Sequence, residues 1–279
     1  MPGLSERPVT RLDDPARRDA YVAEVFDLIA PRYDRFTRWF SYGMDAAWKR
    51  EVRSCMAAAL VVPEAPAAPV IVDLACGTGD LAIYARCIAP RGLCIGLDIS
   101  RPMLARAGVR AAQESPPCAR GDGGIHFAGG DMTRLPLADG TADLVTAGYG
   151  LRNAARLDDA LDEIARILRP GGTLVTLDFF LPERPVWRSV FLGYLAMAGC
   201  LYGALWHGRP DAYVYIPRSI RRFVTAQAYE RALADRGFRV VSAQPRLLGG
   251  VMVHMAVKAS GVGSGGSGAP LPGQATSPL

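Results

Sequence analysis

Short apolar runs alternate with amphipathic stretches through the middle of the chain. Five runs have the length and the valine, leucine and isoleucine content of strands buried on both faces. They cover residues 70–75, 92–99, 125–131, 142–150 and 171–180. Three amphipathic segments lie between them, at residues 79–89, 100–113 and 157–168. Strands that alternate with helices predict a parallel sheet with helices on both faces.

The pattern differs at both ends of this alternation. From Tyr21 to Ala59, apolar residues recur at helical spacing and predict helix. After Phe180 come 18 residues without a charge, 189–206. They are followed by a helix at 225–238 and two strand candidates, 239–248 and 250–259. The polar residues 1–20 and the Gly/Ser/Pro-rich residues 260–279 predict a flexible N-terminus and a disordered tail around one domain, residues 21–259.

Composition narrows the class of protein. The chain has 279 residues, of which 50% are hydrophobic and 21% are charged, which suits one or two globular domains. The net charge is +5, but the arginines alternate with acids, so we expect no nucleic-acid groove. The six cysteines form no CxxC pair and no zinc spacing, so we expect no metal. The N-terminus lacks the apolar run of a signal peptide, and we expect a cytoplasmic protein.

The stretch VDLACGTGDLA, residues 72–82, predicts a strand, a glycine turn and a helix, which is an arrangement that holds nucleotides. A dinucleotide fingerprint has a third glycine where this chain has Ala82. Asp73, just before the turn, would repel a pyrophosphate and suits a ligand with a cationic centre. S-adenosylmethionine, with its sulfonium and amino group, is such a ligand. A purely structural cap on the turn is the alternative role for Asp73.

Two further acids end the next strands. Asp98 can bind both ribose hydroxyls, and Asp131 can accept from an adenine amino group while Met132 packs on the ring. The carboxyl ends of parallel strands form the ligand crevice of an open sheet, so these acids are expected to meet there. The alternatives are a helix N-terminal role for Asp98 beside Ser100 and a plain loop role for Asp131.

With these motifs the sequence resembles the ubiquinone/menaquinone biosynthesis C-methyltransferases, a branch of the class I S-adenosylmethionine-dependent methyltransferases. The resemblance runs from about Val25 to Lys258. It covers the opening signature VFDLIAPRYDRFTRWFSYGMDAAWKR, the segment VDLACGTGDLA, a G-x-R-N signature and the segment DAYVYIPRSI. Departures at Thr37, Ala154 and Arg156 leave the identity of the methyl acceptor open.

The resemblance implies an α/β fold of the Rossmann-like class I methyltransferase type. This is a mostly parallel seven-stranded sheet with an antiparallel C-terminal strand, an N-terminal helical lid (21–60) and a substrate cap with an apolar helix (181–222). The implied cofactor is S-adenosylmethionine. The cofactor-binding residues expected are Tyr33, Asp73, Ala75, Gly77, Gly79, Asp98, Ile99, Asp131 and Met132. The substrate-binding residues expected are Tyr149, Tyr213, Tyr215 and Ser219, for which plain packing is the alternative.

The resemblance also implies the reaction, which is transfer of a methyl group to a ring carbon of a prenylated quinol. The expected catalytic residues are Arg152, which can stabilise a phenolate, and Asn153, which can donate to a ring oxygen. A salt bridge from Arg152 to Asp159 is the structural alternative. His207 and His254 are candidate bases.

The uncharged segment 189–206 approaches the ~20 residues that span a bilayer. We interpret it as a cap helix that holds a prenyl tail and contacts the inner face of the cytoplasmic membrane; a buried core helix is the alternative. The expected partner is a lipophilic aromatic substrate, and a homodimer is compatible with the sequence. Two other functions stay open: a methyltransferase of specialised metabolism acting on a small aromatic or isoprenoid acceptor, and a non-catalytic protein that kept the fold.

Overall fold

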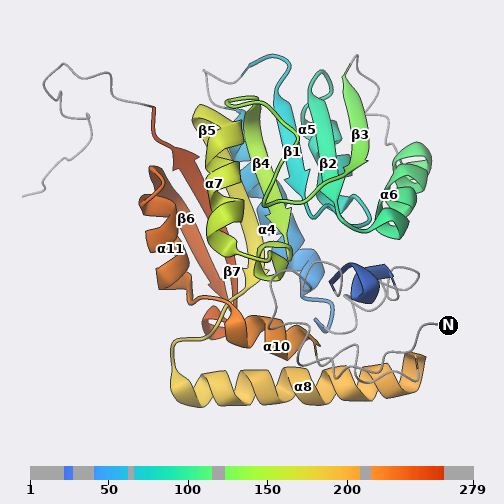
Figure 1. The fold of residues 1–279 in the computed structure, drawn as a ribbon, viewed down its shortest axis with the longest axis vertical. Helices are drawn as coiled ribbons and strands as arrows, with labels where there is room; N and C mark the ends of the chain where they lie inside the picture. Colours follow the sequence, from blue (N-terminus) through green and yellow to red (C-terminus); the bar gives the residue numbers. More distant parts are fainter. Residues whose placement is uncertain (1–21, 28–40, 62–65, 115–122, 208–214, 261–279) are drawn as a thin grey trace, which may run out of the picture.

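A seven-stranded sheet forms the centre of the molecule (Figure 1). The computed structural model describes residues 22–27, 41–61, 66–114, 123–207 and 215–260. The strands are β1 (Val70–Leu74), β2 (Leu93–Asp98), β3 (Gly124–Gly129), β4 (Ala142–Gly148), β5 (Leu168–Phe179), β6 (Phe238–Arg246) and β7 (Val251–Lys258). Their order across the sheet is β3-β2-β1-β4-β5-β7-β6. Neighbours from β3 to β5 are parallel, whereas β7 is antiparallel to both β5 and β6. The predicted sheet with its antiparallel C-terminal strand is confirmed.

Helices cover both faces of this sheet. They are α4 (Asp45–Leu60), α5 (Asp80–Ile88), α6 (Arg101–Glu114), α7 (Leu157–Ile167), α8 (Pro185–His207), α10 (Tyr215–Arg222) and α11 (Ala226–Ala234). Successive strand residues point to opposite faces. Ile71 therefore packs with Val52 and Met56 of α4, and Val72 packs on the other face with residues of α7 and α11. The central strands β1, β4 and β5 are buried on both faces and mostly apolar, as the sequence pattern indicated, whereas the edge strands β3 and β6 are partly exposed.

The order in which successive strands are added to the sheet changes direction between β1 and β4. The chain moves from β1 outward to β2 and β3, then returns to place β4 on the other side of β1. Loops after β1 and β4 therefore diverge, which opens a crevice at the carboxyl ends of the strands. The glycine turn follows β1, and the short 3-10 helix η3 (Leu151–Asn153) follows β4.

The helix predicted from Tyr21 to Ala59 is not continuous. Residues 22–27 are helical, residues 28–40 lie outside the described part of the chain, and α4 starts only at Asp45. A turn at 41–44 precedes α4, and in it Tyr42 and Gly43 take positive φ values of 50° and 77°. This left-handed backbone cannot belong to an α-helix. Apolar residues keep their helical spacing across the turn, so periodicity alone could not predict this break.

The segment RPGG, residues 169–172, is part of a strand that the sequence pattern predicted only from residue 171. It lies inside β5, which begins at Leu168, directly after α7. Opposite it, the pairing of β4 with β5 shifts register between Ala142 and Leu144. The extra residues are thus accommodated as a bulge.

Helix α8 lies along one edge of the molecule, away from the sheet (Figure 1). It is longer than the uncharged run, since it begins at Pro185 and ends at His207. Phe191, Leu192 and Leu195 bury one side of it in the same cluster that contains α4. The indole of Trp187 donates to the carbonyl of Leu247 at 2.9 Å, which fixes the start of α8 to the segment before β7.

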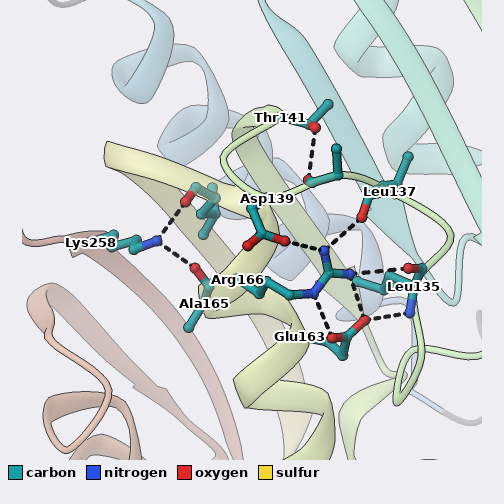
Figure 2. Close-up of polar contacts among 10 residues, drawn as sticks. Leu135, Leu137, Asp139, Thr141, Glu163, Ala165, Arg166 and Lys258 are labelled. Carbon is teal, nitrogen blue, oxygen red and sulfur yellow. Dashed lines mark hydrogen bonds and ion pairs between the residues drawn. The ribbon is translucent and has the colours of Figure 1, made fainter.

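Arg166 of α7 fixes the loop that leads from β3 to β4, as Figure 2 shows. Its guanidinium donates to the carbonyls of Leu135 and Leu137 and pairs with Asp139 and Glu163. Glu163 in turn accepts from the backbone N–H of Leu135 at 2.6 Å. The loop that carries Asp131 and Met132 at its start is therefore held against a helix rather than left to solvent.

Candidate functional site

A cavity of about 680 Å³ lies at the carboxyl ends of β1, β2 and β4. We call it the main cavity. Its lining combines the glycine turn, the ends of three strands and the helical residues 22–27. The residues are Val22, Phe26, Leu74, Ala75, Gly77, Leu97, Asp98, Ile99, Met103, Gly130, Asp131, Met132, Gly148, Tyr149, Gly150, Asn153 and Ala154. Eight of the residues predicted for the site thus line this one cavity.

The glycine turn forms the floor between β1 and α5. Ala75, Gly77 and Gly79 have φ values of 50°, 54° and 85°, all in the left-handed region. Glycine adopts this region without strain, and the turn needs it to bring the chain directly into α5. Gly79 is the residue before α5 begins, and the backbone N–H of Gly77 donates to Asp98 at 2.8 Å. The turn is therefore fixed to the end of the neighbouring strand.

Asp73 lies beneath the turn and not on its surface. Its carboxylate accepts from Thr146 Oγ1 at 2.7 Å and from the backbone N–H of Ala82 at 3.1 Å, and its exposure is 2%. Burial raises the pKa of Asp73 to about 7, although both hydrogen bonds oppose the shift. Asp73 therefore holds the start of α5, which is its alternative structural role, and its contact with a ligand stays a prediction.

Asp98 ends β2 and faces the main cavity. Its carboxylate accepts from Gly77 N and from Ser100 N, each at 2.8 Å. Burial raises its pKa, and these hydrogen bonds oppose the shift. Ser100 Oγ donates to Asp27 at 2.5 Å, so the helical residues 22–27 are joined to the end of β2. A carboxylate oxygen can accept more than one hydrogen bond, so Asp98 can still bind ligand hydroxyls.

Asp131 and Met132 lie side by side on the wall beyond β3. Asp131 Oδ1 accepts from the backbone N–H of Thr133 at 2.8 Å, which turns the loop back on itself. The Asp131 backbone also bridges to Arg134 and accepts from its N–H. The pair is placed on the same cavity as Asp98, as the strand-end argument predicted.

Tyr149 separates the main cavity from the space behind the turn. Its φ is 61°, unusual for a tyrosine, and its N–H donates to Leu177 O at 2.6 Å. Its hydroxyl donates to Asp45 of α4 at 2.8 Å, and its ring packs 5.5 Å from that of Phe179. A strained residue held from three sides is typical of functional sites.

Arg152 follows β4 but points into the protein. Its guanidinium donates to Asp178 at 2.6 Å and to the Tyr149 carbonyl at 2.6 Å. Asp178 also accepts from the backbone N–H of Arg152 and is fully buried. The expected alternative partner, Asp159, pairs instead with Arg156, at 3.4 Å. Arg152 is not among the residues that line the main cavity, and its contact with an acceptor stays a prediction.

Asn153 lines the main cavity and is joined to α10. Its Oδ1 accepts a short hydrogen bond from the Tyr215 hydroxyl, and its Nδ2 donates to the Tyr149 carbonyl at 3.2 Å. Tyr215 is buried, and its ring meets that of Phe26 edge-on at 6.4 Å. Ser219, also on α10, is buried and donates to Ile216 O of its own helix, and its contact with a substrate stays a prediction.

A second space of about 420 Å³, which we call the inner pocket, continues behind Tyr149. It shares Ala75, Gly77, Gly148 and Tyr149 with the main cavity and adds charged residues. These are Lys49, Asp73 and Asp80. Burial alone would raise the pKa of Asp80, but Lys49 and Arg110 outweigh it and lower the pKa to about 2.

The remaining expected residues are placed as follows. Tyr33 and Tyr213 lie outside the described residues, as does the side chain of His207. His254 is buried on β7 against Tyr229 and Phe180 and does not line the main cavity. Among the residues that line the site, sequence reasoning gave no role to Val22, Lys49, Thr78 and Met103. Asp178 was also missed, although it ends a strand as Asp73, Asp98 and Asp131 do.

The charges of the main cavity indicate which ligand fits. Its described lining has two carboxylates, Asp98 and Asp131, and neither lysine nor arginine. Such a wall repels a pyrophosphate but suits hydroxyl and amino groups, which donate to carboxylates. The inner pocket adds both signs of charge in one small space, which suits a zwitterion. S-adenosylmethionine has these groups in this order: adenine and ribose, a sulfonium, and an amino-acid end.

Comparison with known proteins then decides the family. The model of the ubiE/COQ5 methyltransferase family matches residues 15–258. The chain belongs to this family. The Demethylmenaquinone methyltransferase of Thermus thermophilus is 38% identical over 77% of this chain and 92% of its own length. The enzyme of the same name from Lactiplantibacillus plantarum is 33% identical over 85% of this chain and 95% of its own.

Solved structures support the same fold. The SpnF cyclase superposes with a TM-score of 0.61 at 17% identity and covers 87% of this chain and 97% of its own. The YcgJ protein of Bacillus subtilis superposes with a TM-score of 0.54 at 16% identity, over 76% of this chain and 100% of its own. As a member of the ubiE/COQ5 family, the protein is an S-adenosylmethionine-dependent methyltransferase with a Rossmann-like fold.

Two further properties of the described residues bear on the membrane and on metal binding. No helix there is both long and apolar enough to cross a membrane. Within the same residues, no group of three histidine, cysteine, aspartate or glutamate side chains is arranged to hold a metal ion.

Proposed function

We propose that this methyltransferase methylates a ring carbon of a prenylated quinol in quinone biosynthesis. The observation that carries the proposal is similarity over nearly the full length of relatives named Demethylmenaquinone methyltransferase, at 30–38% identity. The geometry supports it, since the polar end of the main cavity, at Asn153, lies beside α10, which in turn contacts the apolar helix α8.

The reaction requires a positioned acceptor and little else from the protein. When bound, S-adenosylmethionine supplies a methyl group activated by its positively charged sulfur. Loss of a phenolic proton moves electron density onto the ring carbon, which forms the new C–C bond as the C–S bond breaks. The proton on that carbon then leaves and restores the aromatic ring. Holding the carbon in line with the methyl group is the main contribution required of the chain.

Residues at the polar end are suited to this positioning. We propose that Asn153 and Tyr215 hold a ring oxygen of the quinol, since the amide lines the cavity and the phenol is hydrogen-bonded to it. Arg152 acts one layer further back as a positioning residue. Its bond to the Tyr149 carbonyl fixes the segment that carries both Tyr149 and Asn153. Tyr33, Tyr213 and the cofactor-binding residues named from the sequence keep their proposed roles.

A row of aromatic rings connects the cavity wall with α8. Tyr149 packs on Phe179, Phe179 lies 6.4 Å from Phe191 of α8, and Phe191 lies 5.9 Å from Trp187. These rings form one layer between α8 and the cavity wall, so α8 lies close to the cavity. This proximity supports the proposal that the cap, residues 181–222, receives the prenyl tail.

The purified protein tests the proposal directly. It should convert demethylmenaquinol with a short prenyl tail, kept reduced by dithionite, into a product heavier by one methylene. S-adenosylhomocysteine should form in equal amount, and NMR should place the methyl group on the ring carbon. An Asp98→Ala variant controls for background transfer. Turnover of only small aromatic or isoprenoid acceptors would contradict the quinol proposal and favour a role in specialised metabolism.

We also propose that the outer face of α8 contacts a membrane surface, where such substrates reside. Val186, Val190, Met197 and Leu201 follow one another along this face with exposures of 80%, 55%, 67% and 60%. A contiguous exposed apolar stripe on a monomer marks an interaction site. Within α8 the only charged side chain is Arg188, and α10, which contacts α8, ends in the exposed Arg221 and Arg222. Basic side chains beside an apolar helix favour anionic lipid.

A matched pair of variants tests this contact. Val190→Glu should reduce sedimentation with vesicles of phosphatidylglycerol and phosphatidylcholine. Val109→Glu on α6, where the native valine is also 55% exposed, should not. Equal binding of both variants would refute the contact. A change from dimer to monomer in Val190→Glu, measured by light scattering, would assign the stripe to a second copy of the chain instead.

A further inference from the structure

Lys49 occupies a special place beside the glycine turn. It lies on α4, and its ammonium contacts Asp80 Oδ2 at 2.6 Å and Asp45 Oδ2 at 3.0 Å. It lines the inner pocket and also a wider polar hollow outside it, which adds Arg53 and Arg110 to the lining. The ammonium therefore lies between the space behind the turn and solvent.

The inner pocket is continuous with the main cavity along shared walls. Ala75, Gly77, Gly148 and Tyr149 line both spaces. A ligand whose ribose binds Asp98 can therefore extend past Gly77 into the inner pocket. The amino-acid end of S-adenosylmethionine carries one ammonium and one carboxylate. Asp73 and Asp80 are the carboxylates of this pocket, and Lys49 is its cation among the described lining residues.

Both acids that contact Lys49 have a second partner. Asp45 accepts from the Tyr149 hydroxyl at 2.8 Å, and Asp80 pairs with Arg110 at 2.6 Å. If Lys49 turns toward an arriving carboxylate, neither acid becomes an uncompensated buried charge. Arg110 pairs with Asp80 but does not line the inner pocket, so it is placed to hold Asp80 and not the ligand.

We propose that Lys49 binds the carboxylate of the amino-acid end of S-adenosylmethionine. The three donors of an ammonium allow it to keep one of the two acids while it contacts the ligand. Binding of the cofactor's carboxylate by Lys49 does not depend on which acceptor is methylated.

Calorimetry with two natural adenosine thioethers tests the assignment without turnover. S-adenosylhomocysteine has the amino-acid end, and 5′-methylthioadenosine lacks it. Lys49→Met should weaken S-adenosylhomocysteine about 10- to 100-fold, the loss of one charge-assisted hydrogen bond. Binding of 5′-methylthioadenosine should stay within about twofold, because the adenosine groups bind elsewhere. Lys49→Arg should restore part of the lost affinity.

Glu51→Gln is the matched control. Glu51 is also on α4 and pairs with Arg246 at 2.7 Å, away from the pocket, so its loss should leave both ligands unaffected. If Lys49→Met weakens both ligands by the same factor, or neither, the assignment is wrong. The wild-type protein gives a further test that does not depend on a variant folding. Decarboxylated S-adenosylmethionine should bind about 10-fold or more weakly than the intact cofactor, and equal affinity would overturn the proposal.

Discussion

The guanidinium of Arg152 and the carboxylate of Asp178 form an ion pair of 2.6 Å with side-chain exposures of 6% and 0%. Removing one member of a buried pair leaves the other charge uncompensated, at a cost of about 3–5 kcal/mol. We expect Asp178→Asn to reduce the free energy of unfolding by about 3 kcal/mol, as measured by urea denaturation. Activity should fall further than stability explains, because Tyr149 and Asn153 share the segment that Arg152 fixes.

Arg156 and Asp159 provide the exposed counterpart of this pair. They lie 3.4 Å apart, with side-chain exposures of 66% and 42%. Arg156→Gln should change the free energy of unfolding by less than about 1 kcal/mol. If the two variants cost the same, the Arg152–Asp178 pair has no special structural role.

Asp73 makes the stability of the protein depend on pH in the opposite sense to a carboxylate whose pKa is lowered on folding. Its folded-state pKa of about 7 exceeds the ordinary value of 3.8, so between these values the folded state binds more protons than the unfolded state. Stability contributed by this group therefore decreases as pH rises from about 4 to 7. Asp73→Asn should raise the melting temperature at pH 8 and abolish cofactor binding. An unchanged or lower melting temperature at pH 8 would contradict the raised pKa.

The same carboxylate predicts a proton release on binding. A cationic ligand stabilises the ionised form of Asp73, so S-adenosylmethionine should displace its proton near pH 6.5. Calorimetry in buffers of different ionisation enthalpy measures this release. In Asp98→Glu, which keeps Asp73, the release should persist wherever binding remains measurable, and its absence in the wild type would refute the coupling.

Tyr215 tests the connection between α10 and the cavity. Tyr215→Phe removes the hydroxyl that Asn153 accepts from and leaves a buried amide oxygen without that donor. We expect the free energy of unfolding to fall by about 1–2 kcal/mol and kcat to fall about tenfold, with a smaller change in cofactor affinity. Tyr229→Phe is the control, since the Tyr229 hydroxyl donates to Thr176 Oγ1 at 3.3 Å in the core between the sheet and α11. A kcat as low in the control as in Tyr215→Phe would indicate a general packing effect.

His254 acts on stability in the opposite direction to Asp73. Burial lowers its pKa to about 4, below the ordinary 6.5, so the unfolded state binds more protons between these values. Its contribution to stability is present above pH 6.5 and is lost as pH falls toward 4. His254→Leu should flatten the loss of stability between pH 6.5 and 4, as measured by thermal unfolding. A curve parallel to that of the wild type would contradict the lowered pKa.

The strand ends of the site could be predicted from the sequence because they depend on topology alone. An acid after a buried parallel strand must lie at the shared carboxyl edge, and Asp98 and Asp131 do so. Asp178 follows the same rule and could have been found by it. The partner of Arg152 could not be chosen by nearness in sequence. Pairing of β4 with β5 brings Asp178 beside η3, whereas Asp159 lies at an exposed helix start.

Contacts from α4 were beyond sequence reasoning for a different reason. Asp45 and Lys49 look like an ordinary i, i+4 surface pair of a helix. Their role depends on where α4 meets the turn, which is set by the break at Tyr42 and Gly43 and by the docking of Val52 and Met56. The position of α4 against the glycine turn depends on packing in the core, which no local sequence pattern specifies.

The order β5-β7-β6 has a consequence for synthesis of the protein on the ribosome. β6 has no hydrogen-bonded neighbour other than β7 among the described strands, and β7 is the last of them in the chain. A nascent chain that ends at Arg246 therefore exposes the edge of β5 and an unpaired β6. The cavity-forming half, β1 to β4, can assemble earlier, while closure of the sheet waits for residues 251–258 to leave the exit tunnel.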